Sequence, residues 1–382
     1  MAEVLIIGAG IAGTAAAIAL HKAGIEAAVY EAHPQSSLDT GAFLTLASNG
    51  MHALRQIDAD AMVAAAGAPL TVMRIHDGDG TQVGTVPIGD HQHPATRYRY
   101  LTRATLCAVL QQEAQRRGIR IHRGKRLIRV RSGARGPTAF FDDDTQAAGD
   151  VLIGADGLNS TVRTMIDPAA PPRYVGQRIF YGYSTDTGVP AEPDSFNVVR
   201  GAVAFGYIVT GDDGTWWFAR VRDGELRRDD IRHGSTSRWK AALSSLLRQE
   251  RSPAPRIVAA AHRILVTNAY DLPDVTTWHR DGMLVIGDAA HAASPATGQG
   301  ASMALEDAVI LAKALRDQPD VEHAFTSYEQ HRRERVQANI DASARLSGHP
   351  DSPREPPASA PPPRTSTDDF VRTRLVWHHR LG

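Results

Sequence analysis

The chain has 382 residues, 42% of them hydrophobic, and its 42 basic residues balance 42 acidic residues to give zero formal net charge. At about 100–200 residues per domain, this length predicts two domains or three. The charge balance argues against a nucleic-acid binder and an anionic-membrane binder, since both need a basic excess. The one cysteine, Cys107, excludes an internal disulfide framework, a cysteine-type zinc site and a redox-active disulfide pair, and this usage favours a cytoplasmic location.

The uncharged run from residue 4 to residue 20 could be mistaken for a signal peptide or a membrane span. No Lys or Arg precedes it, and a spanning helix needs roughly 20 apolar residues. Glycines also interrupt it. We therefore expect a soluble chain whose N-terminus lies inside the fold.

The first 31 residues predict a strand, a tight turn, a helix and a second strand. Residues 4–7 are a short apolar run that ends at a glycine, which is typical of a buried parallel strand. Residues 14–23 are alanine-rich and favour a helix, and residues 27–30 form the second strand, followed by Glu31.

The turn in this unit, GAGIAG from Gly8 to Gly13, matches the G-x-G-x-x-G pattern of dinucleotide-binding turns. Gly8 permits the tight turn, Gly10 lets the backbone approach a pyrophosphate, and Gly13 lets helix and strand pack closely. The helix N-terminus offers its N–H groups to the phosphates. Glu31 lies 21 residues after Gly10, where its carboxylate would bind ribose hydroxyls and repel a 2′-phosphate. The pattern selects NAD or FAD over NADP; the alternative is an ordinary strand–helix turn.

Residues 51–66 predict one helix, and Thr102 can cap another over residues 103–117. Arg103, at the start of that second helix, can reach phosphate oxygens with its guanidinium group. The alternative interpretation is a surface arginine near a helix start.

A buried strand over residues 151–153 leads into GADGLNSTVR, residues 154–163. Asp156 in this turn can accept hydrogen bonds from sugar hydroxyls or amides. The alternative is an Asx-turn in which Asp156 only caps the following helix.

Residues 171–262 have a different character, because aromatic residues alternate with others over 179–183, 204–208 and 216–221. This pattern predicts an antiparallel sheet with a wall of large side chains. Residues 72–100 contain similar turn-rich strand material that can join it.

A second glycine-rich segment follows a predicted buried strand and runs from Gly287 past Pro295 to a long helix. Gly287 allows close backbone approach, and Asp288 can bind a polyol chain. Gly298 and Gly300 leave N–H groups at a helix N-terminus, which suits a ring whose reduction creates negative charge. An isoalloxazine has that need and nicotinamide does not, so this segment favours FAD over a simple glycine-rich turn.

These motifs, in this order, resemble those of the p-hydroxybenzoate-hydroxylase-like, or group A, FAD-dependent monooxygenases, and especially the smaller bacterial members. The matching segments are GAGIAG with Glu31, R-x-x-L at Arg103, GADGLNSTVR, GDAAHAASPATGQGASMALEDA from Gly287 and, more weakly, Tyr328-Glu329 with Arg332. The resemblance implies an α/β fold with a discontinuous Rossmann-like FAD-binding domain, a β-sheet-rich substrate domain and C-terminal helices.

The expected domains follow from this division. They are residues 1–71, 101–170 and 263–346 for FAD binding, 72–100 and 171–262 for the β-rich substrate domain, 347–366 as a linker and 367–382 as a C-terminal helical segment. Seven prolines between residues 350 and 364 rule out a helix or a central strand in the linker.

The resemblance also implies roles for single residues. Glu31 would hold the adenosine ribose, Arg103 the phosphate or ribitol region, and Asp288 the ribitol, while Asp156 would lie near the nicotinamide approach. Pro295, Gly298 and Gly300 would form the flavin-ring environment in which catalysis occurs, with no side-chain base assigned. The full expected cofactor set is Gly8, Gly10, Ala12, Gly13, Glu31, Arg103, Asp156, Gly287, Asp288, Gly298, Gln299, Gly300 and Ala301.

Two positions depart from the family pattern. Ala32 stands where the family has an arginine, which removes one expected contact on the adenine side. Ser302 stands where an asparagine is frequent, which can adjust the flavin contacts. Neither departure changes the resemblance.

The implied reaction uses tightly bound FAD, NADPH or NADH as a transient reductant, and O₂. By way of a flavin C4a-hydroperoxide, it hydroxylates or epoxidises an aromatic or polyketide-like small molecule. The expected partners are therefore that substrate and O₂, without nucleic acid, membrane or metal, and the oligomeric state stays open. The alternative is a FAD-binding protein of the same fold that is not a monooxygenase, either a scaffold or a cyclase with structural FAD.

The substrate is expected between the flavin ring and the β-rich domain. Phe43, Leu44, Tyr183, Phe205 and Trp217 are candidates for this pocket, with ordinary sheet packing as the alternative for each.

Three histidines could have other roles in the sequence. His91 and His93 lack a third partner for a metal site and favour an exposed loop. His291 is expected to support its turn rather than to act as a base.

Overall fold

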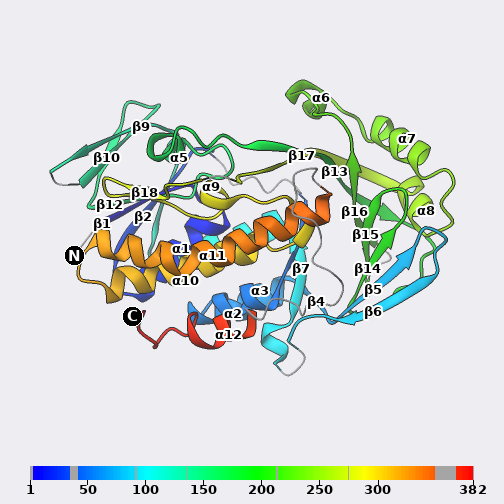
Figure 1. The fold of residues 1–382 in the computed structure, drawn as a ribbon, viewed down its shortest axis with the longest axis horizontal. Coiled ribbons are helices and arrows are strands. Elements are labelled where there is room, and N and C mark those ends of the chain that lie inside the picture. The colour runs from blue at the N-terminus through cyan, green and yellow to red at the C-terminus, as the bar shows by residue number, and fades with distance from the viewer. Residues whose placement is uncertain are drawn as a thin grey trace.

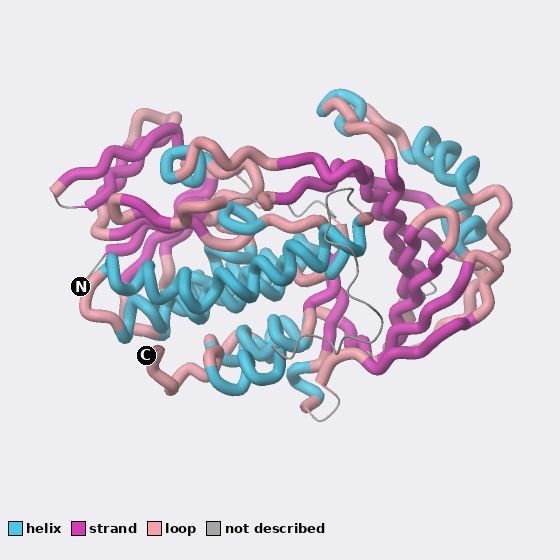
Figure 2. The backbone as a smooth tube through the Cα atoms, viewed as in Figure 1, coloured by secondary structure: helices cyan, strands magenta, loops and turns pink. Residues whose placement is uncertain are grey.

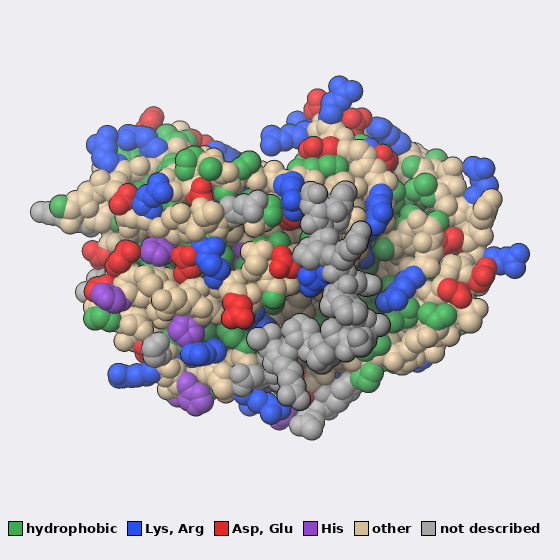
Figure 3. All heavy atoms as spheres, viewed as in Figure 1, with side chains coloured by type: hydrophobic (Ala, Val, Ile, Leu, Met, Phe, Trp, Pro, Cys, Tyr) green, Lys and Arg blue, Asp and Glu red, His purple; other side chains and the backbone are tan. Residues whose placement is uncertain are grey.

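The structure is a computed structural model that describes residues 3–34, 42–90, 93–134, 136–211, 214–273, 275–348 and 367–381. Its two large sheets stand at opposite ends of the molecule, and helices α10 (Gly300–Asp317) and α11 (Val321–Ser347) lie side by side and reach from one end toward the other (Figure 1). Acidic and basic side chains are interspersed over the face drawn in Figure 3, in keeping with the balanced net charge.

The first large sheet has six strands. β1 (Glu3–Ile7) pairs in parallel with β2 (Glu26–Glu31) and with β12 (Val151–Gly154). The other strands are β8 (Arg120–Arg123) beside β2, then β19 (Met283–Val285) and β18 (His279–Arg280) beyond β12. β1 is buried from Val4 to Ile7, as an unbroken apolar run predicts for a strand covered on both faces.

Three of these parallel strands end at one edge of the sheet. Ile7 pairs with Gly154, and Gly154 pairs with Val285, so the loops after β1, β12 and β19 leave the sheet side by side. Helix α1 (Ile11–Lys22) begins in the first of these loops, and its buried alanines allow close packing against α10 and α4 (Arg103–Arg116). In parallel sheets ligands bind outside this edge.

The second large sheet has seven strands and forms the β-rich part of the molecule. In spatial order they are β17 (Ala261–Asp271), β13 (Arg173–Thr185), β16 (Gly214–Arg222), β15 (Ala204–Val209), β14 (Ser195–Arg200), β5 (Val72–Asp77) and β6 (Gln82–Pro87). All neighbours pair antiparallel except β14 and β5. Because β17 belongs to this sheet, the domain boundary that we expected at residue 263 falls inside one of its strands.

Helices cover one face of this sheet. They are α6 (Arg228–Arg232), α7 (Thr236–Leu246) and α8 (Ala254–Ala259), which lie on the outer side of the strands in Figure 2. The apolar side chains of α7 and α8 share one core cluster with buried residues of β15 and β16. The opposite face of the sheet is turned toward the part of the molecule built around the six-stranded sheet, which we call the first domain (Figure 2).

A small sheet lies between the two large ones. Its strands are β3 (Phe43–Leu46), β7 (Tyr98–Thr102) and β4 (Ala68–Leu70). A further sheet of β9 (Leu127–Gly133), β10 (Gly136–Phe141) and β11 (Gln146–Ala148) lies at the end of the molecule remote from the β-rich part (Figure 1).

The helix predicted over residues 51–66 is two helices, α2 (Ser48–Gln56) and α3 (Asp60–Ala66). The chain turns between them at Asp58, whose φ of 56° cannot continue a right-handed helix. By contrast, Thr102 caps α4 as predicted, because its hydroxyl accepts a hydrogen bond from the backbone N–H of Thr105 at 3.0 Å.

The C-terminal segment from α12 (Thr367–Thr373) to residue 381 docks on the first domain. Lys313 and Arg316 of α10 donate hydrogen bonds to the backbone oxygens of Val376 and Trp377, each at 2.8 Å. Helix α11 extends to Ser347, and most of the predicted linker, from residue 349 to residue 366, lies outside the described residues. Within the described ranges, no helix is long and apolar enough to cross a membrane.

Candidate active site

The loop between β1 and α1 is shaped by the absence of side chains. Gly8 has a φ of +105°, and a Cβ atom there would lie 2.5 Å from the backbone oxygen of Ala155. A Cβ on Gly13 would lie 2.0 Å from the oxygen of Gly8. A Cβ on Gly10, however, would meet no atom within 4 Å, although Gly10 is the cap of α1. The fold therefore requires Gly8 and Gly13, whereas Gly10 keeps open the space in front of the helix.

Glu31 lies beside this loop at the end of β2. Its carboxylate accepts hydrogen bonds from the backbone N–H of Ala9 at 2.8 Å and from that of His33 at 2.9 Å. Burial alone would raise the pKa of Glu31, but the hydrogen bonds from His33 and Ala9 outweigh it and lower the pKa. The carboxylate is therefore ionised and fixed next to the loop, as binding of ribose hydroxyls requires.

The loop after β19 interlocks with the first loop. Gly287 has a φ of +58°, and a Cβ there would lie 2.8 Å from the Cβ of Ala12. Asp288 follows as the first residue of α9 (Asp288–His291) and is exposed. Among the described residues, no group donates a hydrogen bond to its carboxylate, which is therefore available to a ligand.

A buried network of charges holds the start of α10 behind this second loop. The Arg332 guanidinium contacts the Asp307 carboxylate at 2.7 Å and that of Glu306 at 2.6 Å. Arg335 adds a second contact to Glu306 at 2.6 Å. Although burial favours the protonated acid, His291 and Arg332 keep the pKa of Asp307 well below its usual range.

His291 belongs to this network. Its Nε2 atom lies 2.6 Å from Asp307 Oδ2, which also accepts a hydrogen bond from the backbone N–H of Gly287 at 2.8 Å. Both groups are buried, so this arrangement favours a structural role for His291. One carboxylate thereby fixes both the turn and the helix that follows it.

The segment before α10, with the turn η2 (Pro295–Thr297), is tied to the small central sheet. The Gln299 side chain accepts a hydrogen bond from Asn49 Nδ2 at 3.2 Å and donates one to the Tyr98 hydroxyl at 3.3 Å. Ser302 accepts a hydrogen bond from the backbone N–H of Ala47 at 3.1 Å. These hydrogen bonds anchor the side chains around the helix start. A Cβ on Gly300 would meet no atom within 4 Å, so the space at the helix start is open.

Asp156 caps a helix, the alternative that its sequence left open. Its carboxylate accepts hydrogen bonds from the Ser160 hydroxyl at 2.5 Å and from the backbone N–H groups of Thr161 and Val162 at 2.7 and 3.2 Å. These groups begin α5 (Thr161–Ile166), and burial raises the pKa of Asp156. Any contact with a cofactor would have to compete with this cap.

Arg103 is exposed at the start of α4, between the two domains. Its charge acts to lower the pKa of Cys107 on its own helix and that of Tyr181 in the β-rich sheet, although burial raises both. Arg103 therefore lies within electrostatic reach of both α4 and the β-rich sheet. Cys107 is half-buried against the main core.

The face of the seven-stranded sheet toward the first domain is aromatic. Tyr183 pairs with Trp216, and Tyr181 pairs with Phe218, so these four side chains share one face, which we call the aromatic wall. The Phe43 ring of β3 lies 6.1 Å from that of Tyr181 and 5.9 Å from that of Trp216. Phe43 and Tyr183, both predicted as pocket residues, thus lie at the wall, whereas Leu44 packs against the main core.

Phe205 and Trp217 lie on the opposite face of the sheet. Both side chains are 0% exposed, their rings stack at 5.3 Å, and Trp217 donates a hydrogen bond to the Ser184 hydroxyl at 2.9 Å. They pack with the core under α7 and α8, which corrects their expected place in the pocket. Sequence reasoning instead missed Trp216 and Tyr100, whose rings lie 5.5 Å apart. The two-residue period of β16 separates Trp216 from Trp217, and only the pairing with β13 shows which face each one takes.

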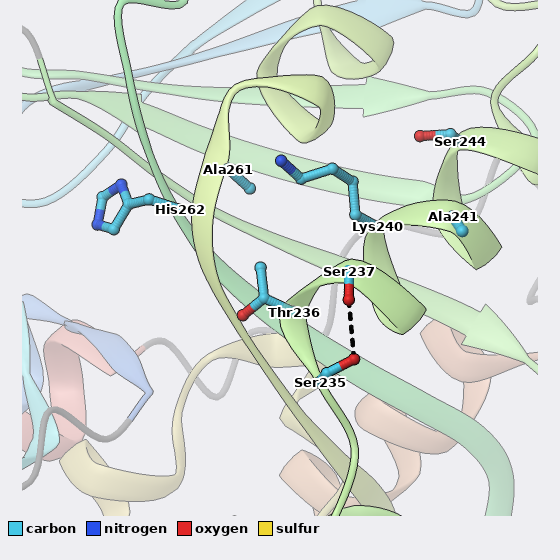
Figure 4. A pocket seen from close by; sticks show the side chains of 8 residues that line it. All are labelled: Ser235, Thr236, Ser237, Lys240, Ala241, Ser244, Ala261 and His262. Carbon is cyan, nitrogen blue, oxygen red and sulfur yellow. Dashed lines mark hydrogen bonds between the residues drawn. The ribbon is translucent and has the colours of Figure 1, made fainter.

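Two further cavities are present among the described residues. One of about 240 Å³ borders the wall at Trp216 and Tyr100. The other, of about 690 Å³, lies beside α7, where Figure 4 shows Ser235 and Ser237 hydrogen-bonded to each other near Lys240. It contains no residue of the glycine-rich motifs.

His91 lies outside the described residues, and His93 binds Asp90 through its Nδ1 atom at 3.0 Å on an exposed turn. Within the part of the chain that the structure describes, no group of three or more acidic, histidine or cysteine residues is placed to hold a metal ion.

Comparison with known proteins agrees with this arrangement. Residues 1–343 match the family described as FAD binding domain. The chain is 30% identical to aurachin C monooxygenase/isomerase of Stigmatella aurantiaca over 350 residues, which cover 90% of this chain and 88% of that protein. It is 28% identical to FAD-dependent urate hydroxylase of Klebsiella pneumoniae over 351 residues, which cover 87% and 86% of the two chains.

The fold also matches a solved structure. Klebsiella pneumoniae HpxO complexed with FAD and uric acid superposes with a TM-score of 0.81 at 25% identity, covering 92% of this chain and 89% of that one. The α/β fold predicted from the motifs is thereby confirmed.

The residues present fit FAD. The start of α1 has no side-chain cap and has open space at Gly10, which suits a pyrophosphate. Asp288 offers an unpaired carboxylate for the ribitol hydroxyls. The start of α10 also has no side-chain cap and is bonded through Gln299 to the small sheet whose Phe43 contacts the wall, so the flavin ring would be held there.

Proposed function

Because the chain belongs to the FAD binding domain family of p-hydroxybenzoate-hydroxylase-like monooxygenases, we propose that it uses NADPH or NADH and O₂ to hydroxylate or epoxidise an aromatic or polyketide-like small molecule. The observation that carries this proposal is that the small central sheet contacts both the segment before α10 and the aromatic wall. Tyr98 bonds Gln299, while Phe43, from the same small sheet, contacts Tyr181 of the wall. A planar substrate between wall and flavin would therefore have an apolar, water-poor surface beside the reacting ring.

FAD, when bound, supplies the redox and oxygen chemistry, and the chain supplies binding, orientation and electrostatics. The first N–H groups of α10 and its helix dipole would stabilise negative charge on a flavin ring bound in front of them. The buried network of Glu306, Asp307 and Arg332 keeps that helix start in place. The aromatic wall excludes water, which favours oxygen transfer to the substrate over release of peroxide.

The substrate class follows from the wall and from the relatives. Their printed names describe a monooxygenase/isomerase of aurachin C and a hydroxylase of urate. Aromatic side chains at Tyr181, Trp216 and Phe218 suit a planar ring system of this kind. The same names favour oxygenation over the alternative of a scaffold or cyclase with structural FAD.

The test is NADPH and NADH oxidation by the FAD-loaded protein, with and without a panel of aromatic compounds, under ¹⁸O₂. We expect one compound or more to stimulate oxidation and to yield a product that carries one ¹⁸O atom. Stimulated oxidation that gives only peroxide across the panel would contradict oxygen transfer. A scaffold would show no stimulation at all.

A further inference from the structure

Steric limits at Gly8 and Gly13 fix the path of the loop between β1 and α1, but they leave one peptide plane in it undetermined. That plane joins Ala9 to Gly10. Because a Cβ on Gly10 would meet no atom within 4 Å, no described atom packs there to hold the plane in one orientation. Glycine also tolerates both signs of φ, so the plane could turn over and present its oxygen, instead of its N–H, to the space before α1.

Two buried side chains hold the oxygen of this plane. The amide of Gln111 on α4 donates a hydrogen bond to the backbone oxygen of Ala9 at 2.6 Å, and the hydroxyl of Thr14 on α1 donates one at 3.1 Å. Both side chains are buried. Because Thr14 lies near the start of α1, the oxygen points along the helix and into the protein.

The opposite edge of the plane carries the N–H of Gly10. In a trans peptide the oxygen and the hydrogen point in opposite directions. The bonds to the Ala9 oxygen therefore direct the N–H of Gly10 away from α1, into the open space before the helix. Within the described ranges, no residue accepts a hydrogen bond from this N–H, so it is available to a ligand.

The Gln111 amide has its own partner on a neighbouring strand. Arg123 of β8 donates a hydrogen bond to Gln111 Oε1 at 2.6 Å, so the amide nitrogen is the end that faces Ala9. Arg123 pairs with Glu31 across β8 and β2, and Glu31 accepts the N–H of Ala9 at 2.8 Å. Groups from α4, β8 and β2 thus fix both sides of Ala9.

We propose that Gln111, oriented by Arg123, is a positioning residue for the diphosphate of FAD, because it holds the Ala9–Gly10 peptide with its N–H toward the phosphate oxygens. N–H groups at a helix start bind phosphate. If the plane turned over, the Ala9 oxygen would face the phosphates and repel them. The inference concerns the cofactor site alone, so it stands or falls separately from oxygen transfer to an aromatic substrate.

The experiment measures the dissociation constant of FAD for the full chain, stripped of flavin, by fluorescence titration. Gln111→Glu keeps the size of the side chain and an acceptor for Arg123, but the ionised carboxylate has no donor for the Ala9 oxygen. We expect the FAD dissociation constant to rise about tenfold or more. Gln111→Leu removes the donor without adding a charge and should raise this constant about threefold to tenfold.

Gln112→Glu is the matched control, because Gln112 is the next residue of α4 and is exposed. It introduces the same charge and should leave the FAD dissociation constant within about twofold of the wild type. An unchanged constant in both Gln111 variants, or an equal rise in the control, would overturn the proposal.

A competition titration separates positioning of the peptide from general damage to the loop. ADP carries the diphosphate and adenosine lacks it. We expect ADP to displace FAD from the wild type at a lower concentration than adenosine does, and Gln111→Glu to reduce this advantage about tenfold. A loss for adenosine as large as that for ADP would assign Gln111 to packing and sink the inference. Equal displacement by the two compounds in the wild type would do the same.

Arg123→Met covers the case in which the Gln111 variants fail to fold, because Arg123 is only half-buried. The substitution frees the Gln111 amide to turn, so the FAD dissociation constant should rise about twofold to fivefold. An unchanged constant would show that Gln111 needs no orienting partner and would reject the proposal.

Discussion

Two glycine-rich loops perform the same task in this molecule by different physical means. Each brings a helix N-terminus to the edge of the six-stranded sheet, α1 after β1 and α10 after β19. The first loop is shaped by steric limits at Gly8 and Gly13, where a Cβ would meet backbone atoms. The second is held by charges, since Asp307 bonds the backbone N–H of Gly287 and pairs with His291.

The two loops differ in how far apart in the sequence the residues lie that hold each loop in place. The path of the first loop is determined within six residues and the strands beside them. The second depends on Arg332 and Arg335 of α11 and on Asn49 of α2, which all contact Glu306. Added volume should therefore damage the first loop, and removal of a charge should damage the second.

The largest effect is expected for Arg332→Ala, which leaves Glu306 and Asp307 buried without their main partner. The loss in free energy of unfolding should be about 3–5 kcal/mol, as for other broken buried ion pairs. Chemical denaturation of the holoprotein measures it. The control is Arg126→Ala, whose side chain is 58% exposed in its pair with Asp142 and should cost about 1 kcal/mol or less. Equal losses in both variants would show that the network does not hold the loop.

Gly13→Ala and Gly10→Ala separate packing from ligand binding in the first loop. The Cβ of the first variant would lie 2.0 Å from the Gly8 oxygen, so stability should fall by about 1–3 kcal/mol and flavin should be lost. The Cβ of the second meets nothing within 4 Å, so stability should change by less than about 1 kcal/mol. Flavin affinity should nevertheless fall about tenfold or more, because the pyrophosphate would need that space. Full flavin retention in Gly10→Ala would place the phosphates elsewhere.

Asp288→Ala tests the second loop without disturbing its network. The carboxylate is exposed and has no partner among the described residues, so the melting temperature of the flavin-free protein should be unchanged. Loss of a charged hydrogen bond to the ribitol should weaken flavin binding by about 1.5–3 kcal/mol. The measurement is the flavin absorbance that remains after gel filtration. Unchanged affinity would remove Asp288 from the cofactor site.

Glu31→Ala should have the smallest effect of the set on flavin binding. The adenosine keeps its other contacts, and the Glu31 carboxylate already has partners in Ala9 and His33. We expect a loss of about 1 kcal/mol or less in flavin affinity by fluorescence titration. A larger loss than in Asp288→Ala would reverse the order of importance of the two loops.

The glycine motifs can be recognised in the sequence because their requirements are local. Gly8, Gly13 and Gly287 occupy positions where a Cβ has no room, and such positions leave short, recognisable patterns. The cap at Thr102 is local in the same way. The turn at Asp58 was missed, since the apolar pattern of residues 51–66 continues through it.

Side-chain partners were harder to predict than motifs. The sequence favoured Asp156 as a ligand group with a cap as the alternative, and the structure shows it capping α5. The partners of Arg332 lie 25 and 26 residues away on α10, so the sequence offered only a weak match there. Trp216 and Trp217 are neighbours in sequence but face opposite sides of the sheet.

The sequence by itself determined the dinucleotide motifs, their order and the cofactor that they suit, because backbone geometry at glycines depends on near neighbours. Only the tertiary structure decided which aromatic residues face the site and which arginine is paired. Strand register and the packing of distant helices settle these points, and both depend on contacts between segments that are remote in the chain. Arg332 has a structural role only because the fold places Glu306 and Asp307 beside it.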